Sequence, residues 1–151
     1  MSSLVSNKEC SGDRANQIMP TLAFRRFKAL KVGSIMKCAD NTGAKYLKII
    51  DVLGKGSRKN RLKSAKLGDI VKVAVKSGIP KYQKKMALAL VIRAKRAYYD
   101  ACQGTYVYFT DNAGVLVQPN GTPIGSVARG VVPRFICQLK PFFKPSGCRF
   151  I

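Results

Sequence analysis

Short apolar runs with a period of two dominate the pattern of hydrophobic and polar residues along the chain. In GDIVKVAVKSG, residues 68–78, Val73 and Val75 alternate with Lys72 and Lys76. Such alternation is typical of a β-strand with one face buried and the other in solvent. Comparable runs predict further strands at residues 32–39, 44–52, 87–99, 105–109 and 114–119. Because the strands are short and no helical pattern separates them, the sequence predicts a mainly β fold, an antiparallel barrel or sandwich.

Both ends of the chain depart from the strand pattern. Residues 1–24 are polar, small and irregular, which predicts an N-terminal extension with little to pack, ahead of a single domain at residues 25–151. Near the other end, residues 131–141 read VVPRFICQLKP, where apolar residues recur at the spacing of an amphipathic helix: Val132, Phe135, Ile136 and Leu139. Pro133 suits the first turn of this short helix, and Pro141 would end it.

The tetrad Asp-Asn-x-Gly occurs twice, each time between two predicted strands. Its carboxylates would suit a metal or catalytic site. However, Asp and Asn side chains bond to nearby backbone, and Asn and Gly tolerate positive φ, so the motif is more typical of a turn or bulge. We therefore interpret six residues as structural turn positions: Asp40, Asn41, Gly43, Asp111, Asn112 and Gly114.

Charge narrows the class of partner. The chain has 28 Lys and Arg against 7 Asp and Glu, a formal net charge of +21 and a pI near 10.2. Such an excess destabilises a compact chain unless a polyanion neutralises it, so nucleic acid or an anionic membrane is favoured over a basic surface with no partner. The longest apolar run, residues 86–92, is far shorter than the roughly 20 residues of a spanning helix. The N-terminus lacks the apolar core of a secretory signal, which favours a cytosolic location and no membrane contact.

Catalysis and metal binding have little support in the sequence. The chain has no histidine, so Ser-His and Cys-His pairs are excluded, and its seven acids form no tight constellation. The five cysteines are scattered without a C-x-x-C motif, which predicts reduced thiols acting as small apolar fillers. We therefore expect no enzyme activity, no metal and no cofactor; an enzyme acting through Asp or Lys is the least favoured alternative.

The basic residues are unevenly distributed. Residues 31–96 hold 18 of the 28 Lys and Arg with only three acids, and residues 55–66, KGSRKNRLKSAK, hold six cations and no acid. Basic loops between rigid strands can lie over phosphates. The predicted RNA-binding residues are Lys45, Lys48, Lys55, Arg58, Lys59, Asn60, Arg61, Lys63, Lys66, Lys81, Lys84, Lys85, Arg93, Lys95 and Arg96. Four tyrosines would suit stacking on unpaired bases, although strands also favour aromatics for packing: Tyr82, Tyr98, Tyr99 and Tyr106.

Several of these segments together resemble a known family. CADNTGAKYLK (38–48), NRLKSAKLGDIVKVAVKSGIP (60–80), ALVIRAKRAYY and YFTDNAGVLV are similar to the universal ribosomal protein family numbered fourteen in the bacterial large subunit, or twenty-three in older eukaryotic naming. The resemblance covers roughly residues 25–145. The N-terminal extension and the basic loop resemble the eukaryotic and archaeal branch. Gln103 and the ending KPSGCRFI depart from the family pattern.

The resemblance implies a small closed five-stranded antiparallel β-barrel with short C-terminal helices and a basic loop. It implies a non-enzymatic constituent of the large ribosomal subunit that binds ribosomal RNA at the face toward the small subunit. Implied partners are neighbouring large-subunit proteins, the small subunit and the anti-association initiation factor six. The implied location is the cytoplasm, with assembly in the nucleus if the source is eukaryotic.

Two further expectations complete the sequence-based interpretation. Phe142 and Phe143 follow Pro141 beside basic residues, and we expect at least one exposed aromatic there to anchor a protein–protein interface. The alternative function from another class is a free-standing OB-like nucleic-acid chaperone or single-strand binder. Such a protein would cycle on and off many sequences rather than stay in one particle.

Overall fold

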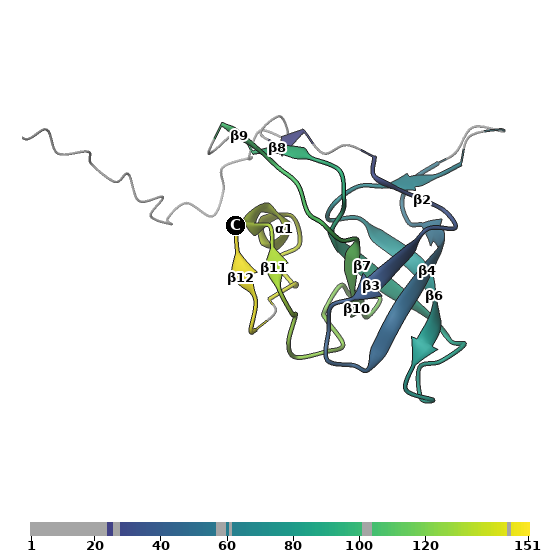
Figure 1. Ribbon diagram of the computed structural model, residues 1–151. Helices are drawn as coiled ribbons and strands as arrows, with labels where there is room; N and C mark the ends of the chain where they lie inside the picture. Colours follow the sequence, from purple (N-terminus) through teal and green to yellow (C-terminus); the bar gives the residue numbers. More distant parts are fainter. Residues whose placement is uncertain (1–23, 26–27, 57–59, 61, 101–103, 145) are drawn as a thin grey trace, which may run out of the picture.

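The computed structural model describes residues 24–25, 28–56, 60, 62–100, 104–144 and 146–151; most of the predicted N-terminal extension, residues 1–23, lies outside the described residues. Five strands close into a barrel in the order β10-β3-β4-β6-β7 (Figure 1). Their bounds are β3 (Ile35–Cys38), β4 (Ala44–Val52), β6 (Ile70–Gly78), β7 (Met86–Arg93) and β10 (Ala113–Val117). The predicted mainly β fold with a closed five-stranded barrel is therefore confirmed.

The pairing of the barrel strands is not wholly antiparallel. β10 pairs with β7 in the antiparallel sense and with β3 in the parallel sense, with Ala113 opposite Lys37 and Gly114 opposite Cys38. The other neighbouring pairs are antiparallel. Strand directions cannot alternate all the way around a ring with an odd number of members, so one parallel pair is required. This corrects the expectation of an entirely antiparallel barrel.

The barrel wall follows the period-two pattern that predicted it. On β6, Val73 and Val75 are buried while Lys72 and Lys76 face solvent, as expected for a strand with one covered face. All five residues of β10 are buried. The chain after β10 folds back along it, since the Ile124 amide donates to the Leu116 carbonyl. Both faces of β10 are therefore covered, and its apolar run does not alternate.

Short accessory strands surround the barrel. β1 (Phe24–Arg25), β8 (Tyr98–Asp100) and β9 (Thr105–Val107) form a three-stranded sheet, and β2 (Leu30–Lys31) pairs with β5 (Ser64–Ala65). The predicted strand at residues 87–99 is divided: β7 ends at Arg93, a bend follows, and β8 joins the accessory sheet. One long apolar-to-basic run therefore serves two different sheets.

The C-terminal segment packs beside the barrel (Figure 1). It contains β11 (Val131–Val132), the helix α1 (Arg134–Leu139) and β12 (Arg149–Phe150), which pairs parallel to β11. α1 is the one helix among the described residues, with Pro133 as its N-cap. Val132, Phe135 and Ile136 are buried, whereas Leu139, at the last helical position, is exposed.

Aromatic packing joins this segment to the accessory sheet. The Tyr98 ring lies 5.2 Å from the Phe135 ring, edge to face, and 6.2 Å from the Phe109 ring. Edge-to-face pairs at such distances contribute packing energy beyond the area they bury. Burial raises the pKa of the Tyr98 phenol to about 12. Tyr98 is thus a core residue, and it cannot stack on an RNA base in this fold.

Candidate RNA interface

The first Asp-Asn-x-Gly tetrad connects β3 to β4 and is held by its own carboxylate. Asp40 is buried, and its Oδ1 accepts hydrogen bonds from the backbone amide and hydroxyl of Thr42. Its Oδ2 accepts from the Leu116 amide of β10, at 2.9 Å. The Asn41 amide nitrogen donates to the Ser126 hydroxyl. Gly43 has φ +91°, which side chains with a Cβ rarely adopt, and a Cβ there would also force the exposed Ile79 side chain to move, so the position favours glycine.

The second tetrad uses its residues differently. Asp111 accepts from the Arg93 Nε at 3.0 Å, and the Asn112 side-chain oxygen accepts from the Lys95 amide. The pairing register between β10 and β7 shifts between Ala113 and Gly114, which marks an irregularity of the bulge type. Gly114 does not need positive φ; a Cβ there would lie 2.8 Å from the Met36 Cε. Close packing therefore explains Gly114, rather than turn conformation.

Arg93 belongs to the fold rather than to the solvent-facing surface. Its side chain is 11% exposed, and its guanidinium donates to Asp111 and to the carbonyls of Arg129 and Val131. A guanidinium with three sets of acceptors has few donors left for a phosphate. The prediction that Arg93 binds RNA is corrected on this ground: Arg93 ties β7 to the C-terminal segment.

The basic segment at residues 55–66 is partly neutralised by acids from elsewhere in the chain. Lys55 forms an ion pair with Asp69, and the Lys63 Nζ lies 2.9 Å from the Asp51 Oδ1. The hydrogen bond from Lys63 is the main reason that the pKa of Asp51 is lowered. The Lys66 backbone amide also donates to Asp69.

The remaining predicted positions of this segment divide into two groups. Arg58, Lys59 and Arg61 lie outside the described residues. Asn60 is exposed and lines a shallow hollow of about 500 Å³ with Lys28 and Lys31. Lys28 and Lys31, which were not among the predicted RNA-binding residues, therefore lie on the same basic surface as Asn60.

The other predicted cations are mostly exposed. Lys81, Lys84 and Lys85 lie in the connection from β6 to β7, where Lys84 has φ +61° and the Lys81 Nζ lies 5.6 Å from the centre of the Tyr82 ring. Arg96 is exposed, but its guanidinium donates to the Lys28 carbonyl. The three lysines of the connection therefore keep their charge at the surface.

The most complete arrangement of cations and aromatic surface lies on the outer wall of β3 and β4. Lys37 is the cross-strand partner of Tyr46, and Lys48 lies two residues beyond Tyr46 on the same exposed face. Lys95 and Arg129 border the same surface from other segments. We call this surface the Tyr46 patch, and its members are Lys37, Lys45, Tyr46, Lys48, Lys95 and Arg129. All six are exposed.

Two hollows share the centre of the Tyr46 patch. One, of about 370 Å³, lies between Lys45 and Arg129; the other, of about 220 Å³, lies toward Lys95. Both are lined by Lys37 and Tyr46. Asp40 and Asp111 also line these hollows, but Asp40 accepts from Thr42 and Leu116, and Asp111 accepts from Arg93. Within the described residues no carboxylate forms an ion pair with a cation of the patch. The patch can therefore offer point charges to phosphates and a ring face to a base.

Sequence reasoning included Lys45, Lys48 and Lys95 but missed the centre of the patch. Lys37 and Tyr46 had a usable signal, because the period-two alternation of β3 and β4 places both on the outward face. Arg129 had no local signal. It reaches the patch because its amide donates to the Ala39 carbonyl, a contact between distant parts of the chain.

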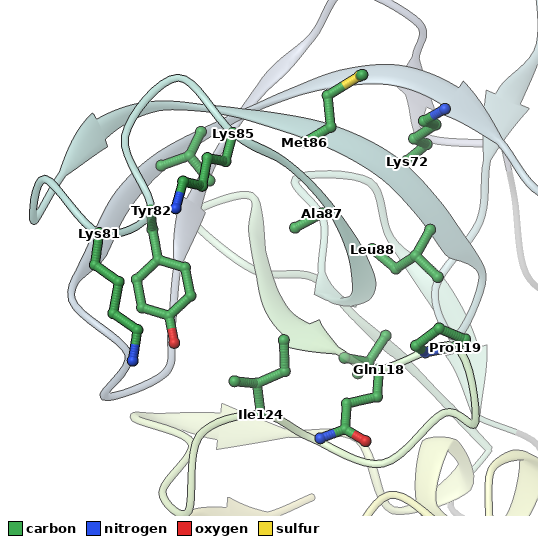
Figure 2. A pocket seen from close by; sticks show the side chains of 12 residues that line it. Lys72, Lys81, Tyr82, Lys85, Met86, Ala87, Leu88, Gln118, Pro119 and Ile124 are labelled. Atoms are coloured by element: carbon green, nitrogen blue, oxygen red, sulfur yellow. The ribbon is translucent and has the colours of Figure 1, made fainter.

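The predicted stacking tyrosines have different environments. Tyr98 is buried, while Tyr106 is 71% exposed and its ring lies 5.1 Å from that of Tyr99. Tyr108, which was not predicted, is also exposed. Tyr82 is half-buried and lines a separate groove (Figure 2). The exposed pair Tyr106 and Tyr108 offers aromatic surface on the accessory sheet.

The described residues offer little for catalysis. No group of three or more His, Cys, Asp or Glu side chains among them could hold a metal ion. Burial, followed by the nearby Asp40 charge, raises the pKa of the Cys38 thiol to about 12, so this thiol stays protonated and unreactive at neutral pH. No helix in the described part of the chain is long and apolar enough to cross a membrane.

The two predicted interface aromatics behave oppositely. Phe142 is 66% exposed, whereas Phe143 is fully buried. Residues 141–142 form a turn that ends with the Phe143 amide donating to the Lys140 carbonyl, so the neighbouring rings point in different directions. The prediction is corrected for Phe143, which is a core residue; Phe142 remains available to a partner.

These features define a class: a small, strongly basic closed β-barrel with exposed lysines and aromatic rings. Residues 29–144 match the family model described as ribosomal protein L14p/L23e. Over 118 residues the chain is 45% identical to the large ribosomal subunit protein uL14 of Candida albicans, and 46% identical to uL14A of Saccharomyces cerevisiae. Each match covers 78% of this chain and 85% of the relative.

This chain belongs to the ribosomal protein L14p/L23e family, whose members are structural and non-enzymatic. The resemblance read from the sequence is thereby confirmed. The two relatives are yeast proteins, which agrees with the expected resemblance to the eukaryotic and archaeal branch.

Proposed function

We propose that this protein is a constituent of the large ribosomal subunit that binds ribosomal RNA through the Tyr46 patch and the basic segment at residues 55–66. The observation that carries the proposal is the Tyr46 patch: five exposed cations without an ion-pair partner among the described residues surround an exposed ring. Phosphate contacts would fix the position of the barrel, and Tyr46 would stack on an unpaired base.

Crosslinking of the assembled subunit, mapped to nucleotides and to peptides, tests this proposal. We expect crosslinks at Lys37, Tyr46 and Lys48, and also within residues 55–66. Substituting Arg58, Lys59 and Arg61 together by Gln should flatten the dependence of log K on log salt by roughly two to three units, about one per lost phosphate contact. Crosslinks confined to other surfaces would contradict the proposed footprint.

We further propose that this protein lies at the face of the large subunit that meets the small subunit, where it supports subunit joining in the cytoplasm. Support comes from the exposed Phe142, a large apolar side chain near Lys140 and Lys144 that suits an interface anchor. The proposed partners are the small subunit and the anti-association initiation factor six, with assembly in the nucleus of a eukaryotic source.

Subunit binding of a Phe142→Ala variant tests the finer assignment. Large subunits that carry this variant should bind the factor more weakly or join small subunits more slowly; unchanged behaviour in both assays would contradict it.

Co-sedimentation with large subunits through a high-salt wash separates a resident protein from the OB-like chaperone alternative. Release of the protein in the wash would favour the chaperone.

A further inference from the structure

An apolar groove lies on the barrel away from the Tyr46 patch, between the β6–β7 connection and the turn after β10 (Figure 2). Its volume is about 480 Å³, within the roughly 300–1,000 Å³ typical of binding sites. Aliphatic side chains dominate its lining, among them Val75, Leu88, Val117 and Ile124. The groove is therefore suited to apolar groups rather than to hydrated ones.

The rim of the groove is basic. Lys72, Lys81 and Lys85 line it, and no Asp or Glu is among the described residues that do so. Figure 2 shows Lys81 and Lys85 on the side of the β6–β7 connection and Lys72 at the far end. Lys72 lies opposite Asp51 in the strand register, so the Asp51 carboxylate partly neutralises the charge of this lysine. Lys81 and Lys85 form no ion pair with a described residue.

We propose that this groove binds an acidic protein segment that inserts apolar side chains between Leu88 and Ile124, over the buried Val75, and places its carboxylates against Lys81 and Lys85. The lysines favour a negatively charged partner, and the aliphatic floor of the groove favours a peptide with apolar side chains. A nucleic acid would satisfy the lysines, but its bases would meet an aliphatic floor with one ring, Tyr82, and one side-chain amide, Gln118, to recognise them. A peptide with alternating acidic and apolar residues uses both parts of the site.

This proposal is independent of the Tyr46 patch, because the groove shares no lining residue with either hollow of that patch. It adds a protein-binding surface to a protein for which RNA binding is proposed. Within a ribonucleoprotein particle such a surface would hold an acidic tail or loop of a neighbouring protein against the barrel.

Fluorescence anisotropy with short labelled peptides tests the site on the full chain. The probe is a peptide that alternates Glu and Leu; its control alternates Glu and Gly. A chain of net charge +21 attracts any acidic peptide, so the control sets the purely electrostatic affinity. We expect the Leu peptide to bind at least about tenfold more tightly, because its leucine side chains are removed from water when they enter the groove. Equal affinities for the two peptides would overturn the proposal.

A pair of matched substitutions locates the binding. Ile124 in the groove and Ile50 on β4 have almost the same exposure, 39% and 40%. Ile124→Asp should remove most of the preference for the Leu peptide, about tenfold, whereas Ile50→Asp should leave it within about twofold. Equal effects of the two changes would place the peptide elsewhere and overturn the proposal.

Two further measurements complete the test. Should Ile124→Asp fail to fold, methyl chemical shifts of Leu88 and Ile124 in the unsubstituted protein replace it, and we expect both to move on addition of the Leu peptide but not of the control. A labelled oligouridylate is the nucleic-acid probe. If it displaces the Leu peptide and shifts the same methyl signals, the groove is a nucleic-acid site and the proposal fails. If it binds without displacing the peptide, the proposal stands.

Discussion

Lys55 and Lys63, in the basic segment at residues 55–66, differ from the lysines of the Tyr46 patch in the charges that face them. Lys55 and Lys63 are paired with Asp69 and Asp51, whereas the cations of the patch have no ion-pair partner among the described residues. The first group lies in the densest run of positive charge in the sequence, and the second is spread over several segments. A position in the densest basic run therefore does not by itself make a lysine available to a partner, since Lys55 and Lys63 already face carboxylates.

The few acids of the chain decide which of the described cations remain available to a partner. Asp51, Asp69 and Asp111 each hold one cation, and the buried Asp40 accepts from backbone and hydroxyl donors instead. Each paired cation supports the local fold, and each unpaired one adds to the field that attracts a polyanion. Pairing should therefore reduce what a cation offers to RNA. Its effect on stability should depend on burial: large for Arg93, which is 11% exposed, and small for the partly solvated Lys63.

The largest expected effect is on stability, at Arg93. Arg93→Ala should lower the free energy of unfolding by about 3 kcal/mol, because it leaves the Asp111 carboxylate and two carbonyls without their donor. Urea denaturation measures this change. Lys95→Ala, an exposed neighbour, is the control and should change it by less than about 0.5 kcal/mol. An Arg93→Ala protein of normal stability but weakened RNA binding would show that Arg93 belongs to the interface after all.

The next effect is on RNA affinity. Substitution of Lys37 and Lys48 together by Gln should flatten the slope of log K against log salt by roughly one and a half to two units, since each is proposed to contact about one phosphate. The matched change, Lys55→Gln with Lys63→Gln, should alter the slope by less than about one unit, because those charges already face carboxylates. Filter binding with a large-subunit RNA fragment over a salt series measures both. A larger effect from the paired lysines would reverse the comparison.

A smaller effect on RNA affinity is expected at Tyr46, and it should distinguish base stacking from charge in the Tyr46 patch. Tyr46→Leu should weaken RNA binding by about 1 kcal/mol and leave the salt slope unchanged, because a ring stacks on a base without releasing counterions. Tyr46 is 48% exposed, so the change should hardly affect stability. Tyr106→Leu is the control for an exposed ring outside the patch. Loss of affinity from Tyr106→Leu alone would move the stacking site to the accessory sheet.

Much of the barrel was predictable because its signal is local. The run at residues 44–52 became β4 with the same bounds, and residues 68–78 contain β6. The two-residue strands were not predictable, since their pairing joins distant residues such as Leu30 with Ala65 and Val131 with Arg149. Alternation marks a buried face only over longer segments.

The candidate site was less predictable than the barrel for the same physical reason. Lys63 and Asp51 are 12 residues apart, and Arg93 and Asp111 are 18 apart, so composition alone assigned all these lysines and arginines to RNA. Exposure of Lys37 and Tyr46 followed from alternation, but the position of Arg129 depended on the path of the chain after β10. Which charges are neutralised is a property of the tertiary structure.

The smallest expected effect is the titration of Asp51, which tests whether its pair with Lys63 persists in solution. The hydrogen bond from Lys63 lowers the pKa of Asp51 below its ordinary value of 3.8, and Lys63→Met should raise it toward that value. Since the folded pKa is the lower one, the pair contributes stability above about pH 4 and loses it as the pH falls through the folded pKa.

Carboxyl NMR of Asp51 across an acid titration measures the shift directly. The free energy of unfolding near neutral pH should hardly change in Lys63→Met, because both partners are partly solvated and such pairs contribute little. An Asp51 pKa that is the same with and without Lys63 would mean that this lysine is unpaired in solution. Lys63 would then join the cations available to RNA, and the contrast between the two basic regions would rest on Lys55 alone.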